Sequence, residues 1–224
     1  MGRIIVYGDI HGCLDEWRLL RSKIGVRPGD AEISVGDLLS KGPKPVETLR
    51  YARENGVLTI LGNHEERFLE IAGAKEAGRE GIVHRASLKH FEKLSSADLA
   101  YLFAMPRFLK VANLTVVHAG LTNGIHLGRL EEEHKPLLTR LRYVSKGAAS
   151  PEYVFWSELY NGSQGFVVYG HTPGSVRRDD FALGIDTGCV YGEKLTAAIF
   201  EWKGAKLDTA RAAIEQVSAK ERYA

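Results

Sequence analysis

Short apolar runs alternate with amphipathic segments along the first third of the chain. The run at 4–7 is rich in β-branched residues and stops at a glycine, which is typical of a strand buried on both faces. From 14 to 24, apolar side chains recur every three or four residues, which predicts a helix ended by a glycine. Further strands are predicted at 31–35 and 57–61, with a helix at 45–55. Repeated strand, turn and helix units predict a largely parallel sheet covered by helices, an α/β fold.

The remainder of the chain predicts a second sheet. A hairpin is expected from the strands 108–111 and 114–117. Later strands are predicted at 166–169, 181–185 and 195–202. We expect this sheet to be more antiparallel than the first and to pack against it.

Two segments predict surface structure. Residues 65–105 have a helical pattern, interrupted by Gly73, Gly78 and Gly81, which indicate a mobile surface loop whose role the sequence does not indicate. Residues 203–224 are polar and Ala-rich, which predicts a surface C-terminal helix or tail. The whole chain, 1–224, is expected to form a single domain.

The composition excludes several classes of protein. The 224 residues are 44% apolar and 26% charged, which excludes a disordered or fibrous chain. With 30 basic and 28 acidic residues the net charge is +2, so no DNA binding through a broadly basic surface is expected. The longest apolar stretch, Leu99 to Met105, has seven residues, where a membrane helix needs about 20. No membrane partner is expected, and any phosphate-bearing partner must be held locally.

The cysteine content indicates a reducing compartment. Cys13 and Cys189 are the two cysteines, and a domain of this size does not need a disulfide. The N-terminal apolar run of four residues is too short for a signal-peptide core. We therefore expect a cytoplasmic location, with both cysteines packed in the interior.

Five predicted strands end at glycine and a side chain that can bind a metal. The sequences at these ends are GDIHG (8–12), GDLLSKG (36–42), GNHE (62–65), HAG (118–120) and GHT (170–172). Because ligands of an open α/β sheet bind at the carboxyl ends of its strands, we expect the five turns to converge. Glycine at such turns leaves room for an ion or a phosphate.

Six side chains in these turns are candidate metal ligands. They are Asp9, His11, Asp37, Asn63, His118 and His171. For any single motif, turn capping or satisfaction of the core is the simpler explanation, but it does not account for all six together. Mixed oxygen and nitrogen donors suit Mn, Fe, Zn, Co or Ni better than a soft metal or one that takes only oxygen ligands. Of these five metals we expect Mn. Two divalent ions that share a carboxylate would use all six donors, and their bridging hydroxide would attack phosphorus.

The ordered set of motifs resembles the calcineurin-like metallophosphoesterases of the phosphoprotein phosphatase superfamily, over about residues 3 to 202. The segments TRLRY (139–143) and IDTGCVYGEKLT (185–196) resemble its ApaH-like branch. That branch is related to symmetrical diadenosine tetraphosphatases and bacterial Ser/Thr protein phosphatases. The resemblance implies a four-layer sandwich, in which two packed mixed β-sheets are flanked by helices.

The resemblance also implies roles for the candidate residues. One metal would be held by Asp9, His11 and Asp37, and the other by Asp37, Asn63, His118 and His171, with Asp37 bridging. His64 matches the general acid of the family, which would protonate the leaving-group oxygen. Arg140 and Arg142 are candidates to hold phosphate oxygens, because a guanidinium presents a planar fork. The alternative is that both arginines lie on the solvent face of a strand.

The second motif departs from the protein phosphatases, which read GDxVDRG there. In this chain Ser40 and Lys41 replace the acidic residue that supports the catalytic histidine and the arginine that grips phosphate. Lys41 can neutralise a phosphate but lacks the bidentate fork, and Ser40 cannot raise the basicity of His64 as a carboxylate would. The lysine variant is a feature of the ApaH-like branch, although Glu65 stands where its tetraphosphatases often have Asp. Tyr191 could stack on a base or touch phosphate, and a packing role is equally compatible with its position.

These features predict a two-metal phosphohydrolase that acts on dinucleoside polyphosphates such as diadenosine tetraphosphate, or on related nucleotide anhydrides. A Ser/Thr phosphoprotein phosphatase is the alternative enzyme, and the 5′ end of an RNA is a further candidate substrate. A non-catalytic scaffold module is the alternative from another class. Such modules usually lose ligands or the general acid, whereas this sequence retains all of them.

Overall fold

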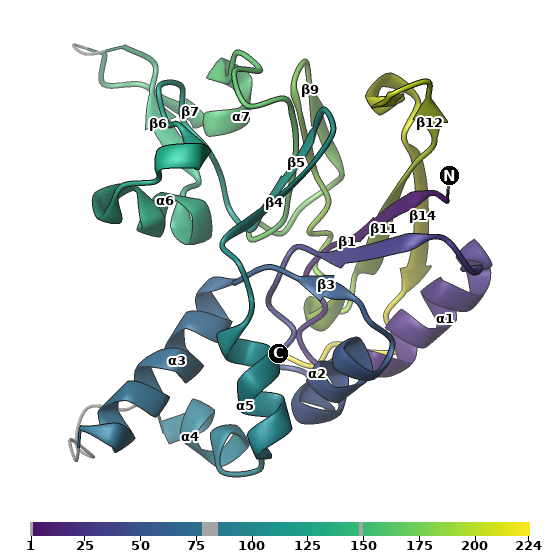
Figure 1. Ribbon diagram of the computed structural model, residues 1–224, viewed down its shortest axis with the longest axis vertical. Coiled ribbons are helices and arrows are strands. Elements are labelled where there is room, and N and C mark those ends of the chain that lie inside the picture. Colours follow the sequence, from purple (N-terminus) through teal and green to yellow (C-terminus); the bar gives the residue numbers. More distant parts are fainter. Residues whose placement is uncertain (1, 78–84, 148–149) are drawn as a thin grey trace.

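The computed structural model describes residues 2–77, 85–147 and 150–224, which contain two five-stranded sheets (Figure 1). The strands of the first sheet are β1 (Ile4–Tyr7), β2 (Ala31–Ser34), β3 (Leu58–Thr59), β11 (Lys194–Phe200) and β14 (Ala213–Ser218), in the order β14-β11-β1-β2-β3. Those of the second are β4 (Phe108–Val111), β5 (Leu114–Val117), β8 (Phe166–Tyr169), β9 (Arg177–Asp179) and β10 (Ala182–Gly184), in the order β4-β5-β8-β10-β9.

Helices cover the outer faces of the two sheets (Figure 1). On the first sheet lie α1 (Leu14–Ile24), α2 (Pro45–Glu54), α3 (Asn63–Glu76), α4 (Arg85–Phe91) and α5 (Ser96–Phe103). Near the second sheet lie α6 (Lys135–Arg140) and α7 (Trp156–Leu159), with the small hairpin of β6 (Tyr143–Ser145) and β7 (Tyr153–Phe155). A second small hairpin, β12 (Trp202–Lys203) and β13 (Lys206–Leu207), follows β11.

The alternation of side chains along β1 explains the layers. Ile5 and Tyr7 pack with the helices α1 and α2, in a core that includes Trp17. Ile4 and Val6 point to the other face, where they meet the second sheet in a core between the sheets. A third core lies on the outer face of the second sheet, against α6 and α7. The order helix, sheet, sheet, helix confirms the expected α/β class and its two packed mixed sheets.

The C-terminal segment differs from the prediction of a surface helix. Residues 213–218 form β14, which pairs antiparallel with β11 over six residue pairs. Without β14, β11 would be an open edge with unpaired backbone donors and acceptors, and this requirement outweighs the local preference of an Ala-rich segment for a helix. Val217 on β14 is buried in the core next to α1.

Two further expectations need correction. Gly73 does not interrupt the chain, because α3 continues through it to Glu76; Gly78 and Gly81 lie outside the described residues. The second sheet is not more antiparallel than the first, since each sheet contains two parallel and two antiparallel pairings. In the first sheet both antiparallel pairings involve β11, a late strand that lies beside β1, and the order of elements along the chain does not reveal that they are neighbours.

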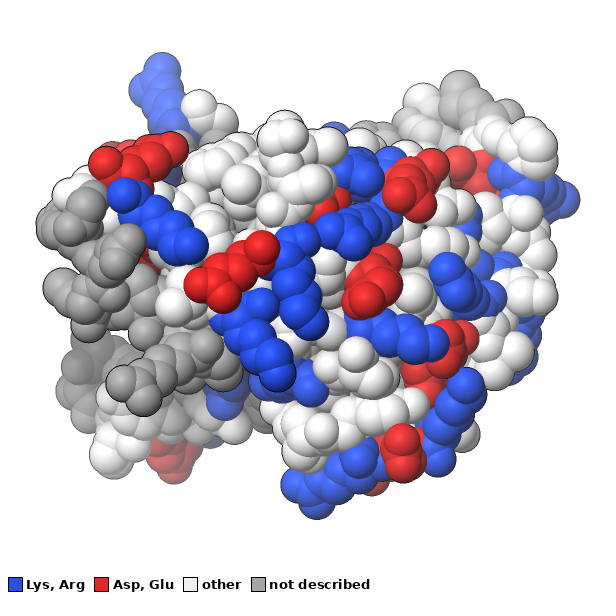
Figure 2. All heavy atoms as spheres, turned by 90° about the horizontal axis from the view of Figure 1, so that it is seen from below, with Lys and Arg blue, Asp and Glu red and all other residues white. Residues whose placement is uncertain are grey.

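The helical face below the first sheet carries a mixture of charges. Figure 2 shows Lys and Arg interspersed with Asp and Glu over this face. Part of the mixture is paired, since Arg50 and Arg53 of α2 both bond to the buried carboxylate of Asp98 on α5. Among the described residues, no helix has the length and apolar character needed to cross a membrane.

Candidate metal centre

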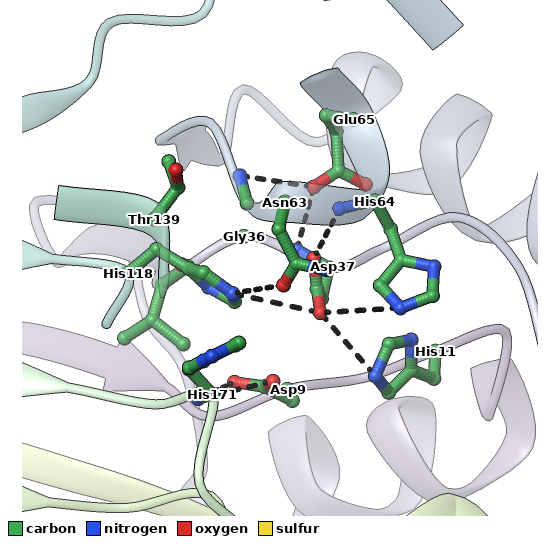
Figure 3. Close-up of polar contacts among 12 residues, drawn as sticks. Asp9, His11, Gly36, Asp37, Asn63, His64, Glu65, His118, Thr139 and His171 are labelled. Atoms are coloured by element: carbon green, nitrogen blue, oxygen red, sulfur yellow. Dashed lines mark hydrogen bonds and ion pairs between the residues drawn. The ribbon is translucent and has the colours of Figure 1, made fainter. Parts of the chain in front are cut away.

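The predicted turns converge at one edge of the two sheets. Asp9 and His11 follow β1, Asp37 follows β2, and His118 follows β5. The structure also brings Asn63, at the start of α3, and His171, after β8, to the same place (Figure 3). Five of these six residues are buried and His171 is half-buried. All six candidates therefore lie together, as the parallel strand order predicts.

Asp37 lies at the middle of this group. Its Oδ2 is 3.4 Å from His11 Nε2, 3.6 Å from His118 Nε2 and 4.0 Å from His64 Nε2 (Figure 3). Its Oδ1 accepts a hydrogen bond from the backbone N–H of His64 at 3.1 Å. One carboxylate oxygen thus faces three imidazole nitrogens, an arrangement suited to a shared ligand.

Two groups with metal-binding geometry share Asp37. One contains His11, Asp37 and His64, and the other contains Asp9, Asp37 and His118, each with its ligand atoms within 4.8 Å of one another. Asn63 Oδ1 adjoins the second group, 3.1 Å from His118 Nε2. Both groupings contain Asp37, the residue expected to bridge, and they do not assign the other donors to one ion or the other.

The backbone at three of these residues adopts the left-handed region. The φ angles are 45° at His11, 52° at Asp37 and 68° at His171. Such a conformation costs a non-glycine residue on the order of 1–3 kcal/mol, and the surrounding structure must impose it. Strain at three candidate ligands is typical of a functional site.

Two glycines allow the carboxylates to approach closely. A Cβ at Gly62 would lie 2.2 Å from Asp37 Oδ1, and one at Gly170 would lie 2.0 Å from Asp9 Oδ1. Beside Gly170, the backbone N–H of His171 donates to both Asp9 oxygens, at 3.1 and 3.2 Å. The glycines in GNHE and GHT are therefore required by contact with a neighbouring motif.

Glu65 holds two of the turns together. Its fully buried carboxylate accepts hydrogen bonds from the backbone N–H groups of Asp37, Leu39 and Gly62, at 2.7, 3.0 and 3.1 Å. Burial, followed by the charge of Asp37, raises the pKa of Glu65 to about 8. The sequence alone showed Glu65 only as a glutamate where the tetraphosphatases of the ApaH-like branch often have aspartate. Its position at the third residue of a helix was the missed signal, because a glutamate there often caps the helix start.

His64 has a hydrogen-bonding partner on the side away from Asp37. Ser40 Oγ lies 2.5 Å from His64 Nδ1, so the serine occupies the supporting position predicted from the motif. Burial, with the charges of Lys41 and Arg67, lowers the pKa of His64 to about 3. The imidazole is thus neutral in this state, and its Nε2 faces the centre.

Asp186 is a further buried carboxylate of this site, which was not identified from the sequence. It follows β10, and its Oδ1 accepts a hydrogen bond from the N–H of Gly188 at 3.0 Å. Burial raises the pKa values of Asp37 to about 7 and Asp186 to about 6, and burial with both neighbouring carboxylates raises that of Asp9. Asp186 could have been found from its place in the IDTG segment, directly after an apolar run.

The donor chemistry fits divalent cations. Three buried carboxylates lie beside imidazoles that burial keeps neutral, as the lowered pKa values of His11 and His118 indicate. Buried negative charge of this kind needs a compensating cation. Mixed carboxylate, amide and imidazole donors match manganese, iron or zinc better than calcium or copper(I).

Basic side chains border the centre. Lys41 Nζ is 3.2 Å from His11 Nε2 and donates to Tyr191 OH at 2.8 Å. Arg142 Nε donates to His171 Nε2 at 3.3 Å. Arg140 instead forms an ion pair with Glu66. Two of the three predicted phosphate-binding residues thus contact candidate ligands directly.

Two cavities flank the loop that follows His171. The larger, about 680 Å³, is lined by Tyr191, Thr187 and Pro173 among others. The smaller, about 400 Å³, is lined by Phe155, Arg177 and Asp186 among others. Volumes of this size are typical of pockets for small organic ligands.

The sequence matches one family model and several named proteins. Residues 2–207 match the model of the calcineurin-like phosphoesterases. A bis(5′-nucleosyl)-tetraphosphatase PrpE, asymmetrical, from Oceanobacillus iheyensis is 27% identical, over 90% of each chain. A symmetrical bis(5′-nucleosyl)-tetraphosphatase from Aromatoleum aromaticum is 28% identical, over 88% of this chain and 93% of the relative.

Solved structures resemble the fold as well. A crystal structure named as a candidate diadenosine tetraphosphatase aligns with a TM-score of 0.76 and 25% identity, over 97% of this chain and 94% of that one. A protein serine/threonine phosphatase from Saccharomyces cerevisiae aligns with a TM-score of 0.66 at 15% identity, over 99% of this chain and 81% of that one. At that identity the second likeness concerns the fold alone.

Proposed function

Because the chain belongs to the calcineurin-like phosphoesterase family, a family of metal-dependent hydrolases, we propose that it cleaves a phosphoanhydride bond of dinucleoside polyphosphates such as diadenosine tetraphosphate. The observation that carries this proposal is the buried carboxylate of Asp37, whose Oδ2 lies within 4.0 Å of three imidazole nitrogens. The tetraphosphatases among its relatives support the choice of substrate.

The six candidate donors would hold a pair of divalent ions. We propose Asp9, His11 and Asp37 for one ion, with Asp37, Asn63, His118 and His171 for the other. We propose manganese, with iron, zinc, cobalt or nickel as alternatives, since the mixed oxygen and nitrogen donors suit all five. When bound, the ions withdraw electron density from the phosphoryl oxygens and increase the acidity of water.

His64 would transfer a proton to the leaving group. The contact between Ser40 Oγ and Nδ1 fixes the ring, so that Nε2 points into the centre. The negative charge of a bound polyphosphate favours the protonated imidazole, from which Nε2 gives its proton to the leaving oxygen. Ser40 therefore acts as a positioning residue for His64.

Lys41, Arg140 and Arg142 would bind the phosphate chain. Lys41 contacts the candidate ligand His11, and Arg142 contacts the candidate ligand His171. Their charges can neutralise phosphoryl oxygens that the ions do not contact. The cavities beside the loop after His171 are large enough to receive nucleosides, with Tyr191 at the edge of the larger one.

Product analysis tests the proposed function. Manganese-loaded protein is incubated with diadenosine tetraphosphate, and the nucleotides are separated by ion-exchange chromatography. Two ADP molecules indicate symmetrical cleavage, whereas ATP with AMP indicates asymmetrical cleavage; either result supports the proposal. The matched control is the same preparation stripped of metal. Absence of nucleotide products above this control refutes the substrate.

The same preparation discriminates the alternative substrates. A phosphoserine peptide and a triphosphorylated RNA are assayed at equal enzyme and manganese concentrations. We expect kcat/KM for the dinucleotide to exceed that for both by at least about tenfold, since the GDLLSKG motif lacks the acidic residue and the arginine expected of protein phosphatases. Faster turnover of the peptide or the RNA would reassign the substrate.

We also infer a cytoplasmic location. Both cysteines, Cys13 and Cys189, are free and buried. A reducing compartment maintains such thiols without a disulfide. Cell fractionation with an antibody against the native protein checks this inference.

A further inference from the structure

A second cluster of charged side chains borders the candidate metal centre. Glu66 of α3 accepts a hydrogen bond from Thr139 Oγ1 at 3.0 Å and pairs with the guanidinium groups of Arg107 and Arg140. Arg107 bonds to Oε1 and Arg140 to Oε2, so the carboxylate bridges the two arginines. The Glu66 side chain is only 10% exposed, which protects these pairs from competition by water.

Strand register places Arg107 at the edge of the sheet where the candidate ligands lie. Phe108 pairs with Val117 in the antiparallel hairpin of β4 and β5. Arg107, which precedes β4, is therefore level with His118, which follows β5. The segment before β4, which contains Arg107, is also held by a backbone hydrogen bond, because the N–H of Leu61 donates to the carbonyl of Pro106 at 2.8 Å.

Arg140 reaches the same edge from the end of α6. The N–H of Ala119, the residue after His118, donates to the carbonyl of Leu138 in α6 at 2.7 Å, so the end of this helix lies beside a candidate ligand. Thr139, the preceding residue, is fully buried and bonds to Glu66. The cluster thus fixes Arg140 through its own ion pair and through its neighbour.

The pair of arginines retains positive charge and free donor capacity. Two guanidinium groups share one carboxylate, which leaves a net charge of about +1 for the cluster. Within the described ranges, the hydrogen bonds of both side chains run through Nη1. The Arg107 and Arg140 side chains are 28% and 46% exposed, so their remaining N–H groups can bind a ligand at the rim of the centre.

We propose that Arg107 and Arg140, held side by side by Glu66, clamp the phosphate groups of the substrate chain that are not being cleaved. This proposal rests on the proposed phosphohydrolase function. Paired guanidinium forks match the oxygens of adjacent phosphates, whereas a phosphomonoester has no second phosphate to bind. Arg107 is then a specificity-determining residue for polyphosphate chains, and Glu66 is a positioning residue.

The test is the selectivity of an Arg107→Gln variant. Steady-state kinetics are measured for manganese-loaded protein with diadenosine tetraphosphate, inorganic tripolyphosphate and p-nitrophenyl phosphate. We expect KM to rise about tenfold for both polyphosphates, the loss expected for one charge-assisted hydrogen bond, with kcat within about twofold. For p-nitrophenyl phosphate, kcat/KM should stay within about twofold of wild type.

Three companion variants sharpen the result. Lys110→Gln removes one positive charge from the exposed face of the same strand, β4, and should leave all three substrates within about twofold. Arg107→Lys retains charge without the fork and should recover part of the polyphosphate KM. Glu66→Gln should shift selectivity in the same direction as Arg107→Gln, because both guanidiniums lose their ionic anchor.

Specific outcomes would overturn the clamp. An unchanged KM for tripolyphosphate in Arg107→Gln, or an equal loss on all three substrates, contradicts it. If the wild type cleaves p-nitrophenyl phosphate and tripolyphosphate but not diadenosine tetraphosphate, the proposed nucleotide substrate is wrong, and the tripolyphosphate comparison still decides on the clamp. Unfolding temperatures of all variants identify any that fail to fold, in which case Arg107→Lys provides the comparison.

Discussion

Single residues at this centre carry buried charge, which a bound cation would compensate, and backbone strain, which the surrounding structure imposes. Asp9, Asp37 and Asp186 are buried carboxylates whose pKa values are raised by burial and, for Asp9, by the other two. His11 and Asp37 also adopt left-handed backbone angles. Protein folding alone would not favour such a group, so its energetic cost is explained by what it binds.

The shared carboxylate gives the first prediction at this scale. Asp37→Asn removes charge from the position between the two ions, so manganese affinity should fall more than about tenfold and the hydrolysis rate should fall with it. Manganese per chain after dialysis, measured by mass spectrometry, and p-nitrophenyl phosphate turnover check this. The matched control is Asp180→Asn, an exposed carboxylate elsewhere. Full manganese occupancy in Asp37→Asn would argue against a bridging role.

The second prediction concerns His64 and its support. His64→Ala should leave manganese bound and slow the reaction by roughly 10²–10⁴-fold with poor leaving groups, since only these need a proton. Ser40→Ala, which removes the 2.5 Å contact to Nδ1, should slow the same substrates by about tenfold. A series of aryl phosphates with different leaving-group pKa values measures the effect. Equal slowing across the series would exclude His64 as the acid.

The strands place these residues at the site in two ways, depending on the direction in which each strand runs. Parallel strands such as β1 and β2 bring the residues at their carboxyl ends to the site. The antiparallel strand β4 brings the residue before its first position, Arg107, to the same edge. Antiparallel β14 instead completes the far side of the first sheet by pairing with β11.

The role of β14 gives a prediction at the scale of the element. Val217→Asp would place a carboxylate in the core beside α1, where Val217 is 7% exposed, and should destabilise the protein by about 3 kcal/mol or more. Ser218→Asp, one residue on and exposed, is the control and should change stability by less than about 0.5 kcal/mol. Urea unfolding followed by fluorescence compares the two. Equal, small effects would indicate that β14 is not essential to the sheet.

The turn before β2 gives a prediction about pH. Asp30 accepts hydrogen bonds from the backbone N–H and guanidinium of Arg3, and this pairing lowers the pKa of Asp30 to about 2. A lowered folded-state pKa means that the stabilisation is present above about pH 4 and is lost as the pH falls toward 2. Asp30→Asn should therefore cost about 2 kcal/mol at pH 7 and progressively less below pH 4. Urea unfolding at pH 7, 4 and 2.5 measures this, and a cost independent of pH would contradict an ionic contribution.

At the scale of the whole molecule, metal binding should be coupled to stability. The candidate ligands come from turns of both sheets, so ions that bind the folded state link the two sheets. At a free manganese concentration of about 100 times Kd, the free energy of unfolding should rise by about 2.7 kcal/mol per ion. Calorimetry with manganese and after chelation measures the shift in Tm. An unchanged Tm in both wild type and Asp37→Asn would show that the centre binds no ion in the folded state.

The sequence by itself determined the α/β class, the early strand and helix order, and the five turns that hold Asp9, His11, Asp37, Asn63, His118 and His171. These features are local, since apolar periodicity, terminal glycines and ligand-type side chains stand next to one another in the chain. That one domain spans the chain remains a prediction. Tertiary structure alone decided the pairing of β14 and the ion pairs of Glu66 with Arg107 and Arg140. Each of these depends on contacts between segments distant in sequence, and neither local propensity nor motif spacing encodes which strand edge or which charge lies opposite.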